Sequence, residues 1–302
     1  MRIPFRYKRA DYGTYSFCKY FFYLTMKFVY SYRQFIELRK IVKGKQLTTY
    51  FQPIMNIQSG DCLGYEILNR PAPSKLFPHT DGFYEYIGTT NQVFAFEMFC
   101  HELSITRYTE ALKHSSPSFA GAVVFLNVHS DVLVNPNYRN AETLHQLYRY
   151  GLKPEQIVFE ITEKQKVEDF EAFEQILSYY RDQGFRIAID DIGSGYSSLK
   201  AIISLKPEFI KLDRSLVQHI DTRPEQQHIV KMLQDVARSS GTHIIAEGIE
   251  RPEELLFLQQ QRIRYGQGYA LGRPSNALQH QNIDDIINQM QMPPLPATGD
   301  CS

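Results

Sequence analysis

Short apolar runs alternate with longer stretches of helical periodicity over most of the chain. Strand residues alternate with a period of two and helix residues with a period near 3.6, so the two kinds of segment can be separated. From residue 47 onward the pattern predicts eight strands: 47–57, 61–70, 122–128, 157–161, 186–190, 208–212, 243–247 and 265–270. Helical segments are predicted over residues 91–113, 168–182, 225–239, 253–261 and 276–290. Eight strands with intervening helices over about 245 residues match a (β/α)8, TIM-like barrel of the α/β class.

The first two predicted strands are joined by Gln58-Ser59-Gly60 instead of a helix. A connection this short predicts a hairpin, so we expect the first strand to run antiparallel to its neighbour. Three parts of the chain follow from the pattern. They are an N-terminal helical extension over residues 1–45, the barrel over 46–290, and a disordered Pro-rich tail over 291–302.

Charge is distributed unevenly along the chain, although Lys and Arg together number 33, as do Asp and Glu. Residues 1–45 hold 11 basic residues and two acids, Asp11 and Glu37, and so carry +9. The remaining residues therefore carry −9. An acidic body argues against binding to a nucleic-acid duplex, because such a surface must be positively charged.

The basic extension has apolar residues at steps of four and three. The seam they form is Phe17, Phe21, Leu24, Phe28, Phe35, Leu38 and Val42, with Ser31 in its one gap. Three interpretations remain open for a helix of this kind. It could pair with a second copy in a homodimer. It could lie on an anionic membrane through Lys19, Lys27, Arg33 and its tyrosines, or pack on its own barrel.

The cysteines and apolar runs bear on the cellular compartment. Cys18, Cys62, Cys100 and Cys301 form no Cys-x-x-Cys pair, which disfavours zinc sites and disulfides and fits a reducing compartment. The apolar run at residues 20–26 is far shorter than a membrane span, and no small-residue cleavage site follows it. We therefore expect a cytoplasmic protein, with peripheral attachment to the inner membrane face as the alternative.

Polar side chains recur near the C-terminal ends of the predicted strands, on the side that faces away from the helices. Glu160, for example, alternates with Phe159 and Ile161. In a barrel this position is the top of the interior, where active sites are built. Seven strands carry such residues: Gln52, Glu66, Asn127, Glu160, Lys211 with Asp213, Glu247 and Gln267.

A group of acidic residues is expected to converge at this mouth of the barrel. The group is Glu66, Glu160, Asp190, Asp191, Glu247 and Glu250, with Arg70 and Lys211 as the only bases. Partly desolvated carboxylates protonate or bind cations, and an oxygen-only set that includes Asn127 suits Mg²⁺ or Mn²⁺. Two such ions would neutralise the site, with the adjacent aspartates as a bridge, as in two-metal phosphate-ester hydrolysis. By itself, the Asp-Asp pair could equally be a turn that caps the next helix.

The motifs along the chain resemble those of the EAL family of cyclic di-GMP phosphodiesterases. The resemblance covers residues 46–290 in the family's order and departs from it at Ile67, Ile192 and His129. None of these departures removes an expected ligand, although Ile192 lies in a loop that the family uses for dimer contacts. The matching motifs are Glu66-Ile67-Leu68-Asn69-Arg70, Phe125-Leu126-Asn127-Val128, Phe159-Glu160-Ile161-Thr162-Glu163, Asp190-Asp191-Ile192-Gly193-Ser194-Gly195-Tyr196-Ser197-Ser198-Leu199, Ile210-Lys211-Leu212-Asp213, Ala246-Glu247-Gly248-Ile249-Glu250 and Gln267-Gly268-Tyr269.

The resemblance implies hydrolysis of cyclic di-GMP to linear pGpG with two Mg²⁺ or Mn²⁺ ions. It implies that Glu66, Asn127, Glu160 and Asp190 hold one ion. The second ion would be held by Asp190 and Asp191, with Glu247 bound directly or through water. Lys211 would lie beside the attacking water, with Asp191 and Glu247 also catalytic. The implied substrate-binding residues are Gln52, Leu68, Arg70, Asp213, Glu250 and Gln267.

Two other functions are compatible with parts of this pattern. The first is a catalytically silent EAL protein that binds cyclic di-GMP or another protein. Silent members usually lack the first Glu, an Asp of the pair or the Lys, whereas Glu66, Asp190, Asp191 and Lys211 are all present here. The second is a different oxygen-ligated metal enzyme on the same barrel, such as an enolase-like one. The Asp-Asp pair and the initial hairpin argue against it.

Overall fold

The computed structural model describes residues 12–119, 121–135, 147, 149–162, 169–193 and 198–291. The chain divides into two compact units, each described by itself below. One unit comprises Met1–Leu47 and Pro71–Tyr86, and the other comprises Thr48–Arg70 and Ile87–Ser302. The second unit contains nearly all of the sheet and the predicted site residues.

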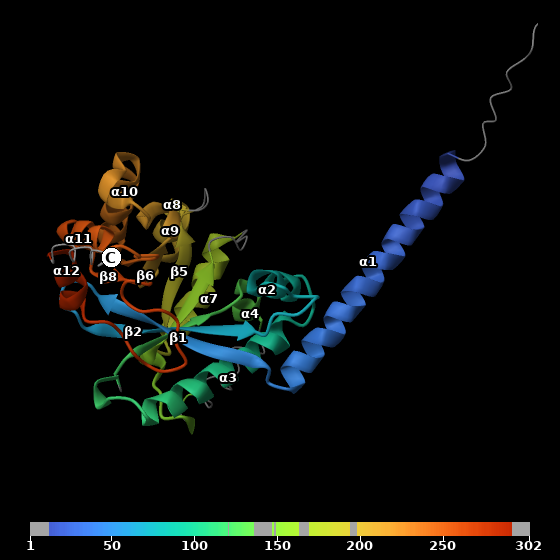
Figure 1. Ribbon diagram of the computed structural model, residues 1–302, viewed down its shortest axis with the longest axis horizontal. Coiled ribbons are helices and arrows are strands. Elements are labelled where there is room, and N and C mark those ends of the chain that lie inside the picture. The colour runs from blue at the N-terminus through green and yellow to red at the C-terminus, as the bar shows by residue number, and fades with distance from the viewer. Residues whose placement is uncertain are drawn as a thin grey trace, which may run out of the picture. The chain divides into compact units, whose positions relative to one another are not determined.

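Eight strands close into a barrel in which neighbours follow the sequence order. Figure 1 shows the barrel strands with helices around them. The strands β2 to β8 pair in parallel, while β1 is antiparallel to β8 and pairs Met55 with Gly266. The barrel and its antiparallel first strand are therefore as predicted. The strands are β1 (Leu47–Asn56), β2 (Cys62–Pro71), β3 (Val123–Asn127), β4 (Ile157–Thr162), β5 (Arg186–Ile192), β6 (Phe209–Leu212), β7 (His243–Ala246) and β8 (Tyr265–Gly266).

Helices connect the parallel strands, and several differ from the prediction. The last helix begins at residue 283 instead of 276, because the side chain of Asn282 accepts a hydrogen bond from the backbone N–H of Asp284 and caps it there. The pattern did not reveal α2, α4, α8 or α9, and β8 ends four residues early. The helices after β2 are α2 (Thr80–Gly88), most of which belongs to the N-terminal unit, α3 (Val93–Lys113), α4 (Ser130–Val134), α7 (Phe170–Arg181), α8 (Ser198–Leu205), α9 (Arg214–Val217), α10 (Pro224–Ser240), α11 (Pro252–Gln260) and α12 (Ile283–Gln291).

Apolar side chains fill two layers of the barrel. Between strands and helices, α7 buries Phe173, Leu177 and Tyr180, which recur at steps of four and three on one helix face. Burying one such side chain contributes about 1.5–3 kcal/mol to folding. The second layer plugs the barrel interior with Ile54, Val123, Phe125, Val158, Ala188, Phe209, Ile245 and Tyr265.

Above this apolar plug, the register of the strands brings their polar residues to one level. Asn127 pairs with Glu160, and Thr162 pairs with Asp190. Leu212 pairs with Ala246, so Glu247 follows directly at the end of β7. The C-terminal ends of neighbouring strands thus place polar side chains side by side.

The N-terminal unit contains the helix α1 (Tyr12–Lys43). It is tied within this unit by two hydrogen bonds, from the Tyr30 hydroxyl to the carbonyl of Leu76 (3.4 Å) and from the Tyr86 hydroxyl to the carbonyl of Ser31 (3.2 Å). Residues 16–33 are all exposed. Among the described helices none is both long and apolar enough to cross a membrane. Residues 1–11 of the predicted extension and residues 292–302 of the predicted tail lie outside the described residues.

Candidate metal and substrate site

Lys211 lies at the centre of an acidic cluster in the upper barrel. Strand β6 directs its side chain inward, where it is 1% exposed. Its Nζ lies 2.7 Å from Oε1 of Glu247, 2.9 Å from Oε1 of Glu160, 3.1 Å from Oε2 of Glu66 and 3.5 Å from Oδ1 of Asp190. Four carboxylates, from β2, β4, β5 and the residue after β7, therefore surround one buried ammonium group.

A bulge in β5 brings both aspartates of the Asp-Asp pair to the mouth. Ile189 pairs with Ile210 and Ile192 pairs with Leu212, so Asp190 and Asp191 together oppose Lys211. Neighbouring residues of a regular strand face opposite sides, and a bulge removes this constraint. Asp191 accordingly has a positive φ of 62°, a conformation that Asp tolerates better than most residues.

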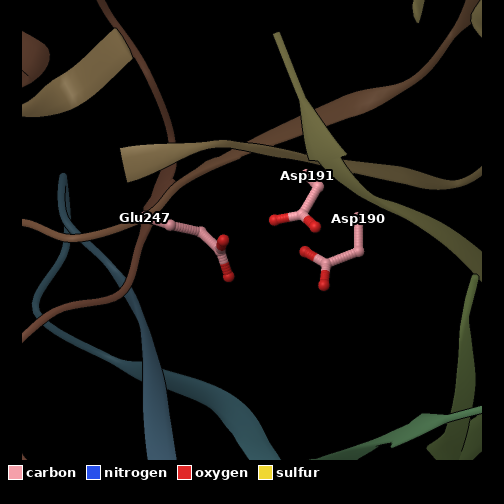
Figure 2. Close-up of side chains that lie close together, drawn as sticks. All are labelled: Asp190, Asp191 and Glu247. Atoms are coloured by element: carbon pink, nitrogen blue, oxygen red, sulfur yellow. The ribbon is translucent and has the colours of Figure 1, made fainter. Parts of the chain in front are cut away.

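The bulge creates a compact group of oxygen ligands. In Figure 2 the side chains of Asp190, Asp191 and Glu247 converge from the ends of two strands. One carboxylate oxygen from each of the three lies within 4.8 Å of the others. Such spacing lets one cation contact all three side chains.

Glu66 is held in its ionised form by neighbouring donors. Gln267 Nε2 donates to its Oε2 at 2.7 Å, Lys211 Nζ donates to the same oxygen at 3.1 Å, and Asn127 Nδ2 donates to Oε1 at 3.3 Å. Burial alone would raise the pKa of Glu66, but the Lys211 charge and the three hydrogen bonds lower it below its usual value. This carboxylate therefore carries a full negative charge into the cluster.

The other acidic residues have too few donors. Burial raises the pKa of Glu160 well above its usual value, raises that of Asp190, and raises that of Glu247 to about 8. Oε2 of Glu160 has no hydrogen-bond donor among the described residues, and the group that faces Glu160 Oε1 and Asp190 Oδ1 is the Lys211 ammonium, at 2.9 Å and 3.5 Å. With Asp191, five carboxylates face one ammonium group when all are ionised, which leaves a charge of −4. Oxygen ligands with this charge fit two hard divalent cations.

Three of the predicted substrate residues lie on β1 and β2. Gln52 donates from Nε2 to the carbonyl of Gly272 (3.4 Å), and Leu68 is half-buried. Arg70 is exposed, with its guanidinium carbon 5.4 Å from the centre of the Tyr50 ring. Stacking on Tyr50 restricts this side chain and leaves its N–H donors available for an anion.

Asp213 and Glu250 have local partners outside the Lys211 cluster. Asp213 caps α9 by accepting from the backbone N–H of Ser215 (2.8 Å), and Glu250 pairs with Arg214 (3.1 Å). Sequence reasoning missed Arg214, a third base near the mouth, although it directly follows Asp213. Its side-chain stem lies against Gly248, where a Cβ would meet Arg214 Cγ at 2.4 Å.

A buried polar network on the outer side of β2 was also missed. Asn69 accepts from Thr49 Oγ1 (2.6 Å) and donates to Ser104 Oγ (2.8 Å), while Arg107 donates to Thr49 Oγ1 (2.8 Å). Asn69 lies between Leu68 and Arg70, so this network fixes the end of β2 that carries both. The only signal of this network in the sequence was Asn69, a polar residue at a strand position that faces the helices.

The sequence model of the EAL domain matches residues 36–274. The chain belongs to the EAL-domain family. The closed barrel with its antiparallel first strand is thus the architecture that the sequence pattern predicted.

Two curated relatives come from Escherichia coli K12. The probable cyclic di-GMP phosphodiesterase PdeG is 26% identical over 245 residues, which are 78% of this chain and 46% of the relative. The probable cyclic di-GMP phosphodiesterase PdeB is 29% identical over 242 residues, which are 77% of this chain and 43% of the relative. This chain thus spans somewhat less than half the length of either relative.

Solved structures of EAL proteins have the same fold. A standalone versatile EAL protein from Vibrio cholerae O395, in its c-di-GMP-bound form, has a TM-score of 0.67 and 27% identity, covering 78% of this chain and 95% of that one. Klebsiella pneumoniae BlrP1, in a calcium/cy-diGMP complex, has a TM-score of 0.67 and 25% identity, covering 79% of this chain and 58% of that one.

Proposed function

We propose that this chain hydrolyses cyclic di-GMP to linear pGpG with Mg²⁺ or Mn²⁺. The observation that carries the proposal is the cluster of four carboxylates around Lys211, with Asp191 beside Asp190 and Glu247 as a fifth. The names of its E. coli relatives and the nucleotide in two similar structures support the choice of substrate.

The chain's oxygen ligands divide into two overlapping sets. Glu66, Asn127, Glu160 and Asp190 would hold one cation, and Asp190, Asp191 and Glu247 would hold the other. Bound divalent cations would polarise the phosphoryl oxygens and lower the pKa of a water molecule. The bulge at Asp190 and Asp191 is the feature that lets adjacent residues serve both sets.

Lys211 would act as an ammonium group instead of a base. Burial lowers its pKa, but Asp190, Glu160, Glu247 and Glu66 raise it further, so the net pKa lies well above the usual value. Before cations bind, the side chain therefore keeps its proton at neutral pH and balances the charge of the four carboxylates. In the proposed reaction it lies where it can orient a water or balance charge on the phosphate.

The proposed reaction opens the ring at one phosphodiester. A water oxygen forms a bond to phosphorus as the bond from phosphorus to the 3′ oxygen breaks. The 3′ oxygen takes up a proton, and the product keeps a 5′ phosphate. Arg70, held by Tyr50, is proposed to bind a phosphate, and the other proposed substrate residues are Gln52, Leu68, Asp213, Glu250 and Gln267.

The test is turnover of cyclic di-GMP by the purified chain with Mn²⁺ or Mg²⁺, with products separated by chromatography. We expect linear pGpG from the wild-type chain and none from Asp190→Asn, because the variant loses the charged ligand shared by both sets. A tenfold loss of rate corresponds to an increase of only about 1.4 kcal/mol in the activation free energy. Activity of Asp190→Asn within tenfold of wild type would therefore contradict the two-metal assignment.

A matched control is Asp235→Asn, which makes the same change on the exposed surface of α10 and should keep full activity. Binding of the nucleotide without turnover at any Mn²⁺ concentration would instead show a silent receptor. Homodimer formation is a separate proposal, which light scattering of the same sample tests.

A further inference from the structure

Helix α1 exposes an apolar stripe that nothing within the described N-terminal unit covers. Phe17, Phe21, Leu24 and Phe28 follow one another at steps of four, three and four, and they are 65%, 62%, 43% and 72% exposed. The rings of Phe17 and Phe21 stack with their centres 6.4 Å apart. A contiguous stripe of large apolar side chains in water marks an interaction surface.

Apolar and aromatic side chains also flank this stripe on both sides. Phe22 and Val29 are exposed to one side of it, and Tyr20 and Tyr23 to the other. Between residues 12 and 36 the chain has six tyrosines and five phenylalanines. Tyrosine favours the boundary between lipid and water, because its ring is apolar and its hydroxyl is polar.

The charges of the same segment all have one sign. Residues 12–36 contain Lys19, Lys27 and Arg33 and no Asp or Glu. Lys19 and Arg33 lie about 160–200° around the helix from Phe17, opposite the stripe, and Lys27 lies at its flank. All three cations are exposed. Long basic side chains in these positions can reach the headgroups of a bilayer while the stripe faces the acyl chains.

A second copy of α1 is a poorer partner for this face. Over residues 12–36, which carry the stripe, two such helices would bring together only positive charges, and the one acid of α1, Glu37, lies beyond the stripe. The apolar surface is also wider than such a seam requires, since it includes Phe22 and Val29. The surface of an anionic bilayer offers both negative charge and a broad apolar contact. It therefore matches the positive charge and the wide apolar face of the helix.

We propose that α1 lies along the surface of an anionic phospholipid bilayer, with the Phe17–Phe28 stripe in the lipid and Lys19, Lys27 and Arg33 at the headgroups. The helix is not apolar enough to cross the bilayer, which fits attachment along its surface. Because α1 is joined to β1 through Gly44, Lys45 and Gln46 alone, the bound helix would retain the barrel at the membrane. This proposal does not depend on hydrolysis of the nucleotide.

The experiment is co-sedimentation of the full chain with vesicles of phosphatidylcholine alone or mixed with phosphatidylglycerol. We expect sedimentation only with the mixed vesicles, and release by added salt because headgroup attraction is screened. The triple variant Lys19→Glu, Lys27→Glu, Arg33→Glu should bind on the order of a hundredfold more weakly. Its control, Lys153→Glu, Lys231→Glu, Arg262→Glu, changes the net charge equally at exposed residues of the barrel unit and should bind like wild type.

A second variant tests the apolar part of the surface. Phe17→Ala, Phe21→Ala, Phe28→Ala keeps a good helix former at each position and should also lose binding. Circular dichroism checks that each variant remains folded. Equal sedimentation of wild type and either α1 variant would overturn the proposal, as would equal binding to uncharged vesicles. Failure of the full chain to bind anionic vesicles would overturn it too, and light scattering would then show whether a dimer covers the stripe.

Discussion

At the scale of single residues, Lys211 determines how the acidic mouth can exist without bound cations. It is the one base within ion-pair distance of Glu66, Glu160, Asp190 and Glu247 among the described residues. A buried charge that loses its partner is strongly destabilising, and here one cation serves four partners. The same side chain therefore contributes to folding and, in the proposed reaction, to the chemistry.

Lys211→Met should destabilise the metal-free protein by about 3–5 kcal/mol, because four carboxylates lose their common counter-charge. Urea unfolding measures this loss, and added Mn²⁺ should restore part of it. Lys231→Met on α10, where the lysine is exposed, should change stability by no more than about 0.5 kcal/mol.

The same variant tests the role of Lys211 in the proposed reaction. In the hydrolysis assay Lys211→Met should lower kcat more than it raises KM. A defect confined to KM would show that Lys211 serves only to hold the mouth together.

At the scale of elements, the β5 bulge depends on the turn that follows it. Gly193 has a φ of 106°, and a Cβ at this position would meet Leu216 Cδ1 at 2.2 Å. Both restrictions keep the backbone after Asp191 in one conformation. The positions of Asp190 and Asp191 therefore depend on Gly193.

Gly193→Ala should lower stability by about 1–3 kcal/mol, since alanine disfavours this conformation and crowds Leu216. Thermal unfolding and hydrolysis assays check the prediction, and activity should fall as Asp191 moves. The control is Gly121→Ala, because a Cβ there meets nothing within 4 Å. A variant of Gly193 with wild-type stability and activity would show that the bulge is fixed by other contacts.

A second element, α3, carries a titratable pair next to the end of β3. Burial raises the pKa of Glu97 from 4.5 to about 8 and lowers the pKa of His101 from 6.5 to about 4. His101 Nε2 lies 3.4 Å from Glu97 Oε2 and 3.2 Å from the carbonyl of Asn127. Both side chains are therefore neutral in the folded protein near pH 7.

Because the pKa of Glu97 is raised on folding, the folded state binds its proton more tightly than the unfolded state does. Stability from this group is present below about pH 4.5 and is lost as the pH rises towards 8. Glu97→Gln should remove that loss, so the variant should gain stability relative to wild type between about pH 5 and pH 8. Urea unfolding of both proteins at about pH 5 and about pH 8 measures this gain in the free energy of unfolding. The His101 contribution has the opposite dependence, being lost as the pH falls from 6.5 towards 4, but both proteins share it.

The sequence predicted the elements that have a strong period and missed those that depend on contacts. The apolar alternation around Glu160 was enough to predict both β4 and the inward direction of its carboxylate. The β5 bulge could not be predicted, because its signal is a pairing with β6 and not a local pattern. Helix α9, with four residues, is too short to show a period, and the start of α12 depends on the Asn282 cap. The partners of Glu250 and Asn69 likewise become visible only when distant segments are brought together.

At the scale of the whole molecule, the acidic barrel should be stabilised by the cations that it is proposed to bind. Mn²⁺ or Mg²⁺ at 100 times its dissociation constant should add about 2.7 kcal/mol to the free energy of unfolding. A chelator should reverse this stabilisation and stop hydrolysis.

Calcium should also stabilise the fold but not support turnover, because its longer bonds and looser geometry misplace the reacting water. Rapid hydrolysis with Ca²⁺ as the only cation would contradict the mechanism.

The direction of β1 has a consequence for how the barrel could receive information from the rest of the chain. In a barrel of eight parallel strands, the first strand begins at the floor, far from the reacting groups. Here β1 is reversed, so its first residues lie beside the end of β2, as the Thr49–Asn69 hydrogen bond shows. The incoming polypeptide thus enters the barrel at the rim that carries Arg70. An upstream segment is therefore connected to the end that is proposed to be catalytic, without an intervening path through the apolar plug.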